Sequence, residues 1–415
     1  MALLKSAKVD KNVFSVFNNP KSTIMKKSYI FAAALAMTAS CAFVASAQEE
    51  NADKPKLKFT PAGRILMDGA LFAPTGDTFS DGVALPDIRL GGKVTYGKFS
   101  AKLDIGYGMK KLGLKDVYMQ YTPNDHNLIR FGYFVHQFGL NAATSSSMKP
   151  SMLAPTSDDF FNATGRNLGV MYVYDKDDWF AGVSVFASSE SLSEYANTQG
   201  KISVGGMGRF LWRPLHTTGS VVQIGVSPWY QGAVHERQDN GETSPGSFSF
   251  STGFPTKVDN VSLLGADISN ARGVFKVTPE LLLSKDRFAL ESQYYYMNVN
   301  RRHGFNSYTA QGAYGLLRCL ILGDNQYGYS HADGGLATPK PKTLECVLGY
   351  NYTNANCNKA AIYGGITNDY SVTFNYYINK YMIARLRWSY TNVWGSSVQD
   401  DRHVNIIQAR IMFKF

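Results

Sequence analysis

Arginine and lysine occupy alternate positions in several segments of this 415-residue chain, with apolar residues between them. In "YMIARLRWSY" they are Arg385 and Arg387, and in the final segment "NIIQARIMFKF" they are Arg410 and Lys414. Successive side chains of a β-strand point to opposite faces, so each segment predicts a strand with one charged and one apolar face. A wetted wall carrying rows of fixed positive charge would attract anions and raise their local concentration.

The same alternation places further basic residues on the charged faces of other predicted strands. All of these basic residues together are the candidate anion-selecting residues. They are Arg64, Arg89, Lys93, Lys102, Arg130, Arg209, Arg385, Arg387, Arg410 and Lys414. The acidic residues in this phase are fewer: Asp68, Asp87, Asp104, Asp116 and Glu291. The alternative for each base is an ion pair with an acid on a neighbouring strand, which would stiffen the wall without selecting ions.

Motifs of enzymes and metal sites are poorly represented. "HERQD" at 235–239 begins like a zinc-protease helix, but Asp239 stands where the second histidine must be. No Gly-x-Ser-x-Gly elbow occurs, and the histidines do not cluster at ligand spacing. We therefore predict no catalytic residue, no metal site and no cofactor.

The start of the chain predicts export. Residues 25–47, "MKKSYIFAAALAMTASCAFVASA", combine a positive start, an apolar run and small residues before a cleavage point after Ala47, as in a signal peptide. We interpret residues 1–24 as an upstream mis-start, with an extended signal as the alternative. A lipoprotein site at Cys41 is a weaker reading, because no aliphatic residue stands three positions before it. Residues 48–57 are expected to form a short periplasmic segment.

Composition favours a barrel in a membrane. Aromatic residues make up 13% of the chain, yet its mean hydropathy is −0.19. A barrel needs aromatic girdles at both interfaces and keeps a polar lumen, which lowers the average hydropathy. Half of the net charge of +10 comes from the leader, since a chain cut after Ala47 has a net charge of +5; this weakens any nucleic-acid interpretation.

Alternating segments recur along residues 58–415, which we predict to be one all-β domain, a transmembrane antiparallel β-barrel of about 16 strands. The segments are 58–71, 84–97, 98–108, 113–122, 126–135, 166–175, 177–187, 200–213, 219–231, 265–278, 286–299, 308–322, 342–352, 369–379, 380–392 and 403–415. Tight turns at 96–99, 122–127, 175–178 and 378–381 suit the periplasmic end. Long connections at 136–165, 232–264, 323–341 and 393–402 are expected at the outer end.

The charged faces decide between a barrel and a soluble sandwich. A buried sandwich face would not carry this many charges, and an Arg or Lys in midplane lipid costs roughly 2–4 kcal/mol. The charged faces must therefore line water, and the apolar faces meet lipid. Phe415 closes one apolar row, and a terminal Phe resembles the signal by which the outer-membrane assembly machinery recognises its clients.

Residues 126–187 resemble the phosphate-selective porin O/P family. The matching pieces are "RFGYF", "FGLN", "SSS" and "GRNLGV" followed by a Trp-led strand, with "GLKDVYMQYT" and "PAGRILMDGA" upstream. The resemblance implies a trimeric channel of sixteen strands, a third loop folded into the lumen, and basic residues at the constriction. The chain departs from the family at Val135 and Gln137, where a lysine and a proline are usual, and at Asn141, where an acid is usual. Phosphate selectivity is therefore in doubt.

Loop 136–165 is the expected constriction loop, with the alternative of a serine-rich loop packed on the wall. Its candidate donors are His136, Ser145, Ser146, Ser147 and Lys149. His136 is expected to titrate near neutral pH.

These observations predict an outer-membrane porin of a Gram-negative-type bacterium, a passive channel for small hydrophilic solutes with a mild preference for anions. Its expected partners are outer-membrane lipid and lipopolysaccharide, the assembly machinery through Phe415, and two further copies in a homotrimer; nucleic acid is not among them. The alternative is a non-conducting barrel that binds surface partners through loops such as 232–264 and 323–341. A Cys346–Cys357 bridge across a hairpin is a further alternative to free thiols.

Overall fold

The computed structural model describes residues 55–73, 78–108, 111–162, 165–192, 202–235, 241 and 244–415. The unit described below is Thr60–Phe415. The predicted mis-start (1–24), the signal peptide (25–47) and most of the periplasmic segment (48–57) lie outside the described residues and stay predictions.

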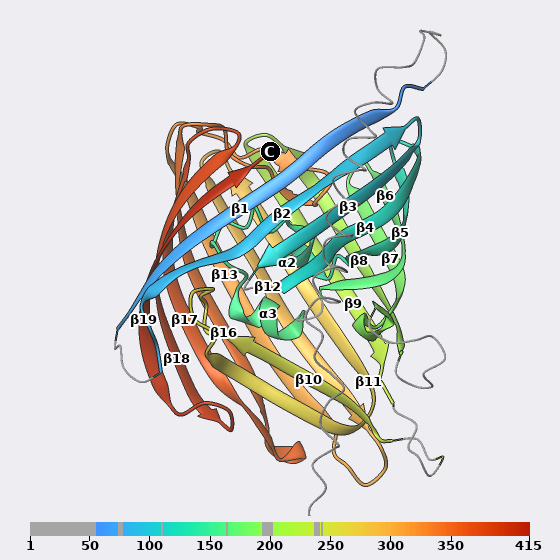
Figure 1. Ribbon diagram of the computed structural model, residues 1–415, viewed down its shortest axis with the longest axis vertical. Helices are drawn as coiled ribbons and strands as arrows, with labels where there is room; N and C mark the ends of the chain where they lie inside the picture. Colours follow the sequence, from blue (N-terminus) through green and yellow to red (C-terminus); the bar gives the residue numbers. More distant parts are fainter. Residues whose placement is uncertain are drawn as a thin grey trace, which may run out of the picture. The chain divides into compact units, whose positions relative to one another are not determined.

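Sixteen antiparallel strands close a β-barrel, as the alternating segments predict (Figure 1). They are β1 (Lys58–Ala73), β2 (Gly82–Tyr96), β3 (Phe99–Gly108), β4 (Lys111–Asn124), β5 (Asn127–Val135), β6 (Arg166–Lys176), β7 (Trp179–Ala187), β8 (Val204–Thr217), β9 (Ser220–Gly232), β11 (Ser262–Lys285), β12 (Phe288–Arg301), β13 (Tyr308–Leu322), β16 (Thr343–Cys357), β17 (Ile362–Tyr377), β18 (Met382–Ser396) and β19 (Arg402–Lys414). The ring closes where β1 pairs with β19, with Arg64 opposite Lys414. Phe415 extends this pairing by exchanging backbone hydrogen bonds with Gly63.

Exposure alternates along the strands in the predicted phase. On β18, Leu386 is 51% and Trp388 42% exposed, whereas Arg385 and Arg387 between them are buried. Phe415 ends an exposed apolar row on β19. The apolar face of each strand is therefore the outer face of the barrel, and the charged face is the inner one.

Strand β10 (Gly246–Gly253) lies inside the predicted loop 232–264 and was not expected. Its ladder runs along the first half of β11, beyond the point where β9 ends on the same edge, and Ser247 forms a further bridge with Val234. Strand β10 therefore adds a hairpin to the barrel rather than a seventeenth barrel strand. The hairpin reaches the opposite wall: the backbone oxygen of Pro255 accepts hydrogen bonds from Arg387 (3.2 Å) and Gln408 (2.6 Å).

The connection between β13 and β16 lies at the end of the barrel that carries the tight turns, so its placement with the outer loops was wrong. The backbone of Tyr327 is hydrogen-bonded to Gly219, in the turn after β8, and to Asp286, in the turn after β11. We call residues 323–342 the strap; it contains the short strands β14 (Tyr329–Ser330) and β15 (Gly335–Leu336). The strap enters the barrel, because Tyr329 donates a hydrogen bond to the inward Gln223 at 2.7 Å.

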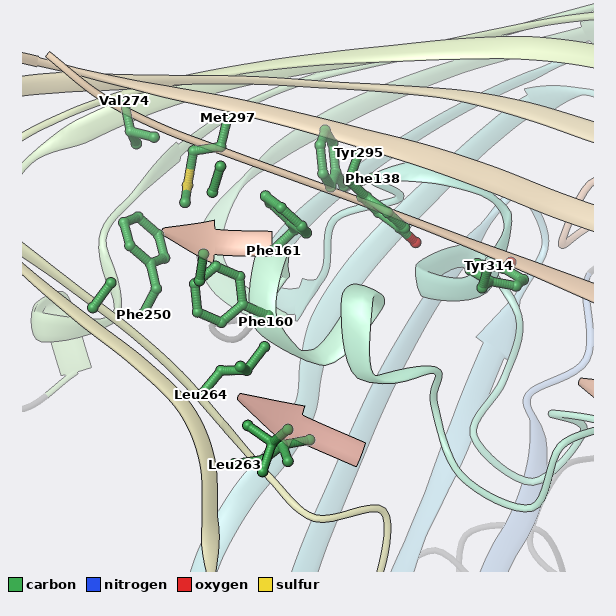
Figure 2. Close-up of a cluster of buried hydrophobic side chains, with 14 of the residues drawn as sticks. Phe138, Phe160, Phe161, Phe250, Leu263, Leu264, Val274, Tyr295, Met297 and Tyr314 are labelled. Carbon is green, nitrogen blue, oxygen red and sulfur yellow. The ribbon is translucent and has the colours of Figure 1, made fainter. Parts of the chain in front are cut away.

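Segment 136–165 makes buried hydrogen bonds with side chains of β9, β12 and β16. It carries the short helices α2 (Gly139–Ala143) and α3 (Thr156–Phe161), and 3-10 turns occur elsewhere at η1 (Ser189–Leu192) and η2 (Asn358–Ala360). Phe160 of α3 lies 6.1 Å from Phe250 of β10, and Phe161 stacks on Tyr295 of β12 at 5.4 Å (Figure 2). These buried aromatic contacts fix the segment on the wall. None of the helices in the described part of the chain has the length and hydrophobicity to cross a membrane.

The cysteine pairing considered from the sequence is wrong, since Cys346 and Cys357 stand at opposite halves of the single strand β16 and both are free. Cys346 is instead directly opposite Cys319 on β13.

Cross-strand neighbours have a Cβ separation of about 4.5–5.5 Å, within a small shift of disulfide geometry. We expect a mild oxidant to join Cys319 to Cys346, measured as a 2 Da mass loss in one peptide pair. Alkylation of Cys357 alone afterwards is the expected companion result, and a bridge involving Cys357 would contradict the register.

Candidate functional site

The two sides of the barrel interior differ in how well they are filled. Inward residues of β8, β9 and β17, such as Arg209, Gln223 and Thr373, are 0% exposed because segment 136–165, the β10–β11 hairpin and the strap cover that side. On β2 to β6 the inward side chains remain partly accessible: Arg89 is 17% exposed, and Lys102 and Arg166 are each 23% exposed. Water therefore has its access to the inner wall along β2 to β6.

This wall is basic, and together with the buried Arg64 of the neighbouring strand β1 we call it the basic strip. Its basic members are Arg64, Arg89, Lys93, Lys102, Lys115, Arg130 and Arg166, and its acidic members are Asp87, Asp104 and Asp116. Seven bases against three acids leave a surplus of four positive charges on one wall. Charge of one sign on a low-dielectric wall focuses the field and enriches counter-ions.

The three acids of the strip each hold basic side chains in place. Asp87 pairs with Arg64, whose Nε lies 2.9 Å from the carboxylate, and with Arg89 at 3.4 Å. Lys102 bridges Asp104 (2.8 Å) and Asp116 (3.0 Å), and Asp116 also accepts from Arg166 at 2.8 Å. These ion pairs hold the basic side chains along the wall and neutralise part of their charge.

Three bases of the strip are left without such a partner. Among the described residues, no carboxylate oxygen lies within 4.0 Å of Lys93, Lys115 or Arg130. Arg130 is held instead by neutral groups, with its guanidinium 4.2 Å from the ring centre of Tyr118 and 2.9 Å from Gln120. None of these three charges is therefore neutralised by an ion pair with a described residue.

Lys115 and Arg166 belong to the strip although the sequence analysis did not select them. A β-bulge between β3 and β4 shifts the register after Leu103, so Lys115 leaves strict alternation. The aliphatic part of the Lys115 side chain lies over the inward face of Gly106, so a Cβ atom at position 106 would collide with Lys115. Arg166 is the first residue of β6, where the alternating pattern has only begun. The sequence feature that could have identified it is the basic residue of "GRNLGV" at the start of a predicted strand.

Four predicted selector residues lie away from the strip, and the structure buries each of them in contacts between wall and inner segments. Arg209 pairs with Glu280 at 2.7 Å and donates to the strap carbonyls of Asp333 and Gly334. Arg410 pairs with Asp68 at 2.6 Å and donates to the carbonyl of Met152 at 2.6 Å.

The other two of these four residues are neighbours on β18. Arg387 pairs with Asp369 at 3.0 Å and donates to Pro255 of the hairpin. Arg385 donates to the carbonyls of Lys149 and Ser147. Lys414, the last predicted base, is half-buried and stands opposite Arg64, at the edge of the strip.

Of the predicted loop donors, only Ser146 touches the strip, accepting a hydrogen bond from Arg64 at 2.8 Å. Ser145 and Ser147 hydrogen-bond each other at 3.1 Å. Lys149 turns back into its own segment, where its ammonium donates to the carbonyl of Asn141 at 2.6 Å.

His136 is fully buried, and the expectation that it titrates near neutral pH is wrong. Its ring lies between Phe134 (4.5 Å) and Phe186 (4.8 Å), with Nδ1 2.9 Å from Ser184 and Nε2 3.2 Å from the carbonyl of Asn167. Burial lowers the pKa of His136 to about 4, with nearby Arg130 contributing in the same direction. His136 thus anchors the start of segment 136–165.

This lowered pKa predicts acid destabilisation. The unfolded chain binds a proton at His136 near pH 6.5 and the folded chain only near pH 4, so stability is complete above about 6.5 and falls between those values. The loss is at most about 3 kcal/mol. Thermal melts in detergent from pH 7 to 4 should show this slope in the wild type and a flatter profile in His136→Gln. Equal slopes of stability against pH in the wild type and the variant would contradict a buried, neutral His136 ring.

The fold resembles solved porins at low sequence identity. Outer-membrane expressed OmpT of Vibrio cholerae superposes with a TM-score of 0.55 at 10% identity, covering 89% of this chain and 100% of that one. An anion-selective porin from Comamonas acidovorans gives 0.54 at 10% identity, covering 87% and 100%. Salmonella typhi OmpF, in complex with daunomycin, gives 0.50 at 13% identity, covering 89% and 100%. These likenesses show the fold.

Sequence comparison shows the family. No curated protein sequence matches the chain significantly. The profile of the family described as phosphate-selective porin O and P matches residues 88–415, which include the strands from the middle of β2 to the C-terminus and most of the basic strip. The chain therefore belongs to the phosphate-selective porin O and P family.

Proposed function

We propose that this protein is an outer-membrane porin of a bacterium, a passive channel that admits small hydrophilic solutes along the basic strip with a preference for anions. Family membership supports the channel, and the strip supports the preference. The single observation that carries the anion preference is the surplus of four positive charges on the accessible inner wall. The buried arginines opposite serve the framework in this proposal, while Lys93, Lys115 and Arg130 meet the solute.

Segment 136–165 is proposed to narrow the passage. Three contacts support this role: Ser146 with Arg64 of the strip, Arg410 with Met152, and the amide of Asn375 with the carbonyl of Pro150 at 2.8 Å. They tie the segment to β1, β17 and β19. His136, at its start, holds it to β6 and β7 through Asn167 and Ser184.

Phosphate selectivity is not part of the proposal. Val135 and Gln137 stand where the resemblance implies a lysine and a proline, and Lys149 is engaged with Asn141. General anion enrichment needs only a surplus of positive charge, whereas phosphate selection needs donors converging on one oxyanion. We therefore expect chloride and phosphate to be admitted according to size and charge.

A homotrimer is proposed for the assembled state. One solved form of Vibrio cholerae OmpT, folded in vitro, is described as a trimer, and it superposes with a TM-score of 0.52 at 10% identity over 88% of this chain. Crosslinking of the protein in native membranes tests this proposal, and a monomer as the largest product would contradict it.

Planar-bilayer recording of the refolded protein tests the channel. Discrete conductance steps are expected, with a reversal potential of anionic sign in a KCl gradient. A cation-selective reversal potential would refute the role given to the strip. Absence of steps would refute the channel itself.

A second candidate, the non-conducting barrel, is favoured by one specific observation: the inner segments fill the side of the barrel lined by β8 to β19. Of the two loops first considered for partner binding, 323–341 is at the tight-turn end, which leaves 232–264 as the candidate at the outer end. Folded protein that never conducts would support this candidate.

A further inference from the structure

One side of the outer wall carries a row of amides at the loop end of the strands, which we call the amide belt. Its members are Asn298, Gln311, Asn354, Asn368, Asn392 and Asn405, on β12, β13, β16, β17, β18 and β19. All are half-buried or exposed and alternate with buried neighbours, so they face outward. The strand register joins them laterally, with Gln311 opposite Asn354 and Asn368 opposite Asn392.

An aromatic row lies directly beneath the belt and donates hydrogen bonds to it. Tyr294 donates to Gln311 at 3.0 Å and Tyr350 to Asn368 at 2.9 Å. The indole N–H of Trp388 lies 3.3 Å from the side-chain oxygen of Asn405. Because an indole nitrogen only donates, this amide must turn its oxygen to the aromatic row and its NH₂ away from it, where the NH₂ also lies 3.5 Å from the carbonyl oxygen of Ala73. Aromatic rows mark the membrane interface, so the belt stands at headgroup level with donors to offer.

The belt contains a hollow of about 610 Å³ on the outside of the wall. Its polar lining comes from β13, β16 and the short connections above them: Asn306, Ser307, Thr309, Asn354, Asn356, Asn358 and Lys359. The amides of Asn306 and Asn356 already donate to the carbonyls of Lys359 (2.6 Å) and Gly395 (2.9 Å). Neutral hydroxyl and amide groups dominate, and Lys359 is the cation among these lining residues. Such a lining suits a ligand with many hydroxyl groups and few charges better than a purely ionic one.

The belt is restricted to one side of the barrel. On β2, β4, β6, β7 and β8 the exposed residues near the loop end are mostly apolar, with Lys111 at the start of β4 as a charged exception: Val83, Leu112, Leu168, Val185 and Val204. If polarity at this level only reflected the water boundary, both sides would show it. The contrast therefore points to a ligand that meets β12 to β19 specifically.

We propose that the amide belt and its hollow bind the sugar headgroup of an outer-leaflet glycolipid of the lipopolysaccharide class. The inference rests on the proposed function, because an outer-membrane porin turns its loop end to that leaflet. The amide NH₂ groups donate to sugar hydroxyl and phosphate oxygens, Lys359 pairs with a phosphate, and the acyl chains lie on the apolar rows below. A phospholipid headgroup, with a single phosphate and few hydroxyl groups, would leave most belt donors unused.

Binding of deep-rough lipopolysaccharide to the purified protein in detergent tests this proposal. The variant Asn354→Leu with Asn368→Leu removes two belt amides on adjacent strands and is expected to bind about tenfold more weakly. The matched control is Asn127→Leu, because Tyr172 donates to Asn127 at 2.5 Å in the same aromatic–amide arrangement at the tight-turn end. The control is expected to bind as the wild type does.

Unchanged binding by the folded double variant, or equal competition by phosphatidylglycerol vesicles, would overturn the proposal. Should the leucine variant fail to fold, Asn354→Asp with Asn368→Asp keeps the side-chain shape, and retained binding by that pair would overturn the proposal equally. Bilayer recording of the same preparations separates the two claims: a wild type without conductance refutes the channel, whereas belt-dependent lipopolysaccharide binding supports the belt in either case.

Discussion

Replacing Lys93, Lys115 and Arg130 with glutamate is expected to reverse the ion selectivity of the channel. The basic strip would change from seven bases and three acids to four bases and six acids. Because these three side chains are the strip members without a carboxylate within 4.0 Å in the described structure, no ion pair is broken by the change. We expect the anion-to-cation permeability ratio, measured as reversal potential in a KCl gradient, to fall by about tenfold and pass below one.

The control is Lys285→Glu, which makes the same charge change at an exposed residue at the tight-turn end of β11. It should leave the reversal potential unchanged, and Lys93→Glu alone should give an intermediate value. An anion-selective triple variant would show that the selecting charges lie elsewhere, for example at the buried arginines.

Removing the strap is expected to give the largest change in conductance. Leu322 and Leu344 are paired neighbours, so a short Gly/Ser turn can replace residues 324–340 without separating β13 from β16. The deletion opens the inner wall at Arg209, Gln223 and Glu345, which the strap now contacts through Gly334 and Tyr327. Single-channel conductance should rise at least about twofold because the passage widens beyond the basic strip.

Tyr329→Phe is the control for this deletion, since it removes the hydrogen bond to Gln223 and leaves the strap in place. Its conductance should equal that of the wild type. If the deletion variant refolds, judged by heat-modifiable migration, and conducts as the wild type does, then the strap lies outside the conducting path.

The strands were predictable because the alternation of apolar and polar residues is a local property of the sequence. Each strand keeps this alternation in the folded barrel, with its apolar residues outward and its polar residues inward. Boundary errors arose where a strand continued past its alternating core, as in β11, which runs to Lys285 although the pattern was read only to residue 278. Strand β10 was missed because eight residues of "GSFSFSTG" look like a polar loop until β11 supplies an edge for them.

The strap shows an error that the sequence could have prevented. Its four glycines and two aspartates are typical of a loop, and its length alone assigned it to the outer end. Counting strands would have placed it correctly, because an even number of predicted strands precedes residue 323 and therefore returns the chain to the end where it started.

The site was only partly predictable, for a different reason. Phase identifies which side chains point inward, and it found Arg89, Lys93, Lys102 and Arg130 of the strip. Whether an inward base meets water or a carbonyl depends on segments distant in sequence, such as Pro255 against Arg387. Lys115 was missed because a β-bulge between β3 and β4 interrupts the two-residue alternation from which inward and outward positions were assigned.

The most direct test of the central claim is the accessibility of the two inner walls during conduction. With the native cysteines replaced by alanine, Lys93→Cys on the basic strip and Thr373→Cys on the filled side would each be exposed to a negatively charged methanethiosulfonate while current is recorded. The current through the Lys93→Cys channel is expected to fall, and the Thr373→Cys channel is expected not to respond. Modification at position 373 with no response at position 93 would contradict this expectation.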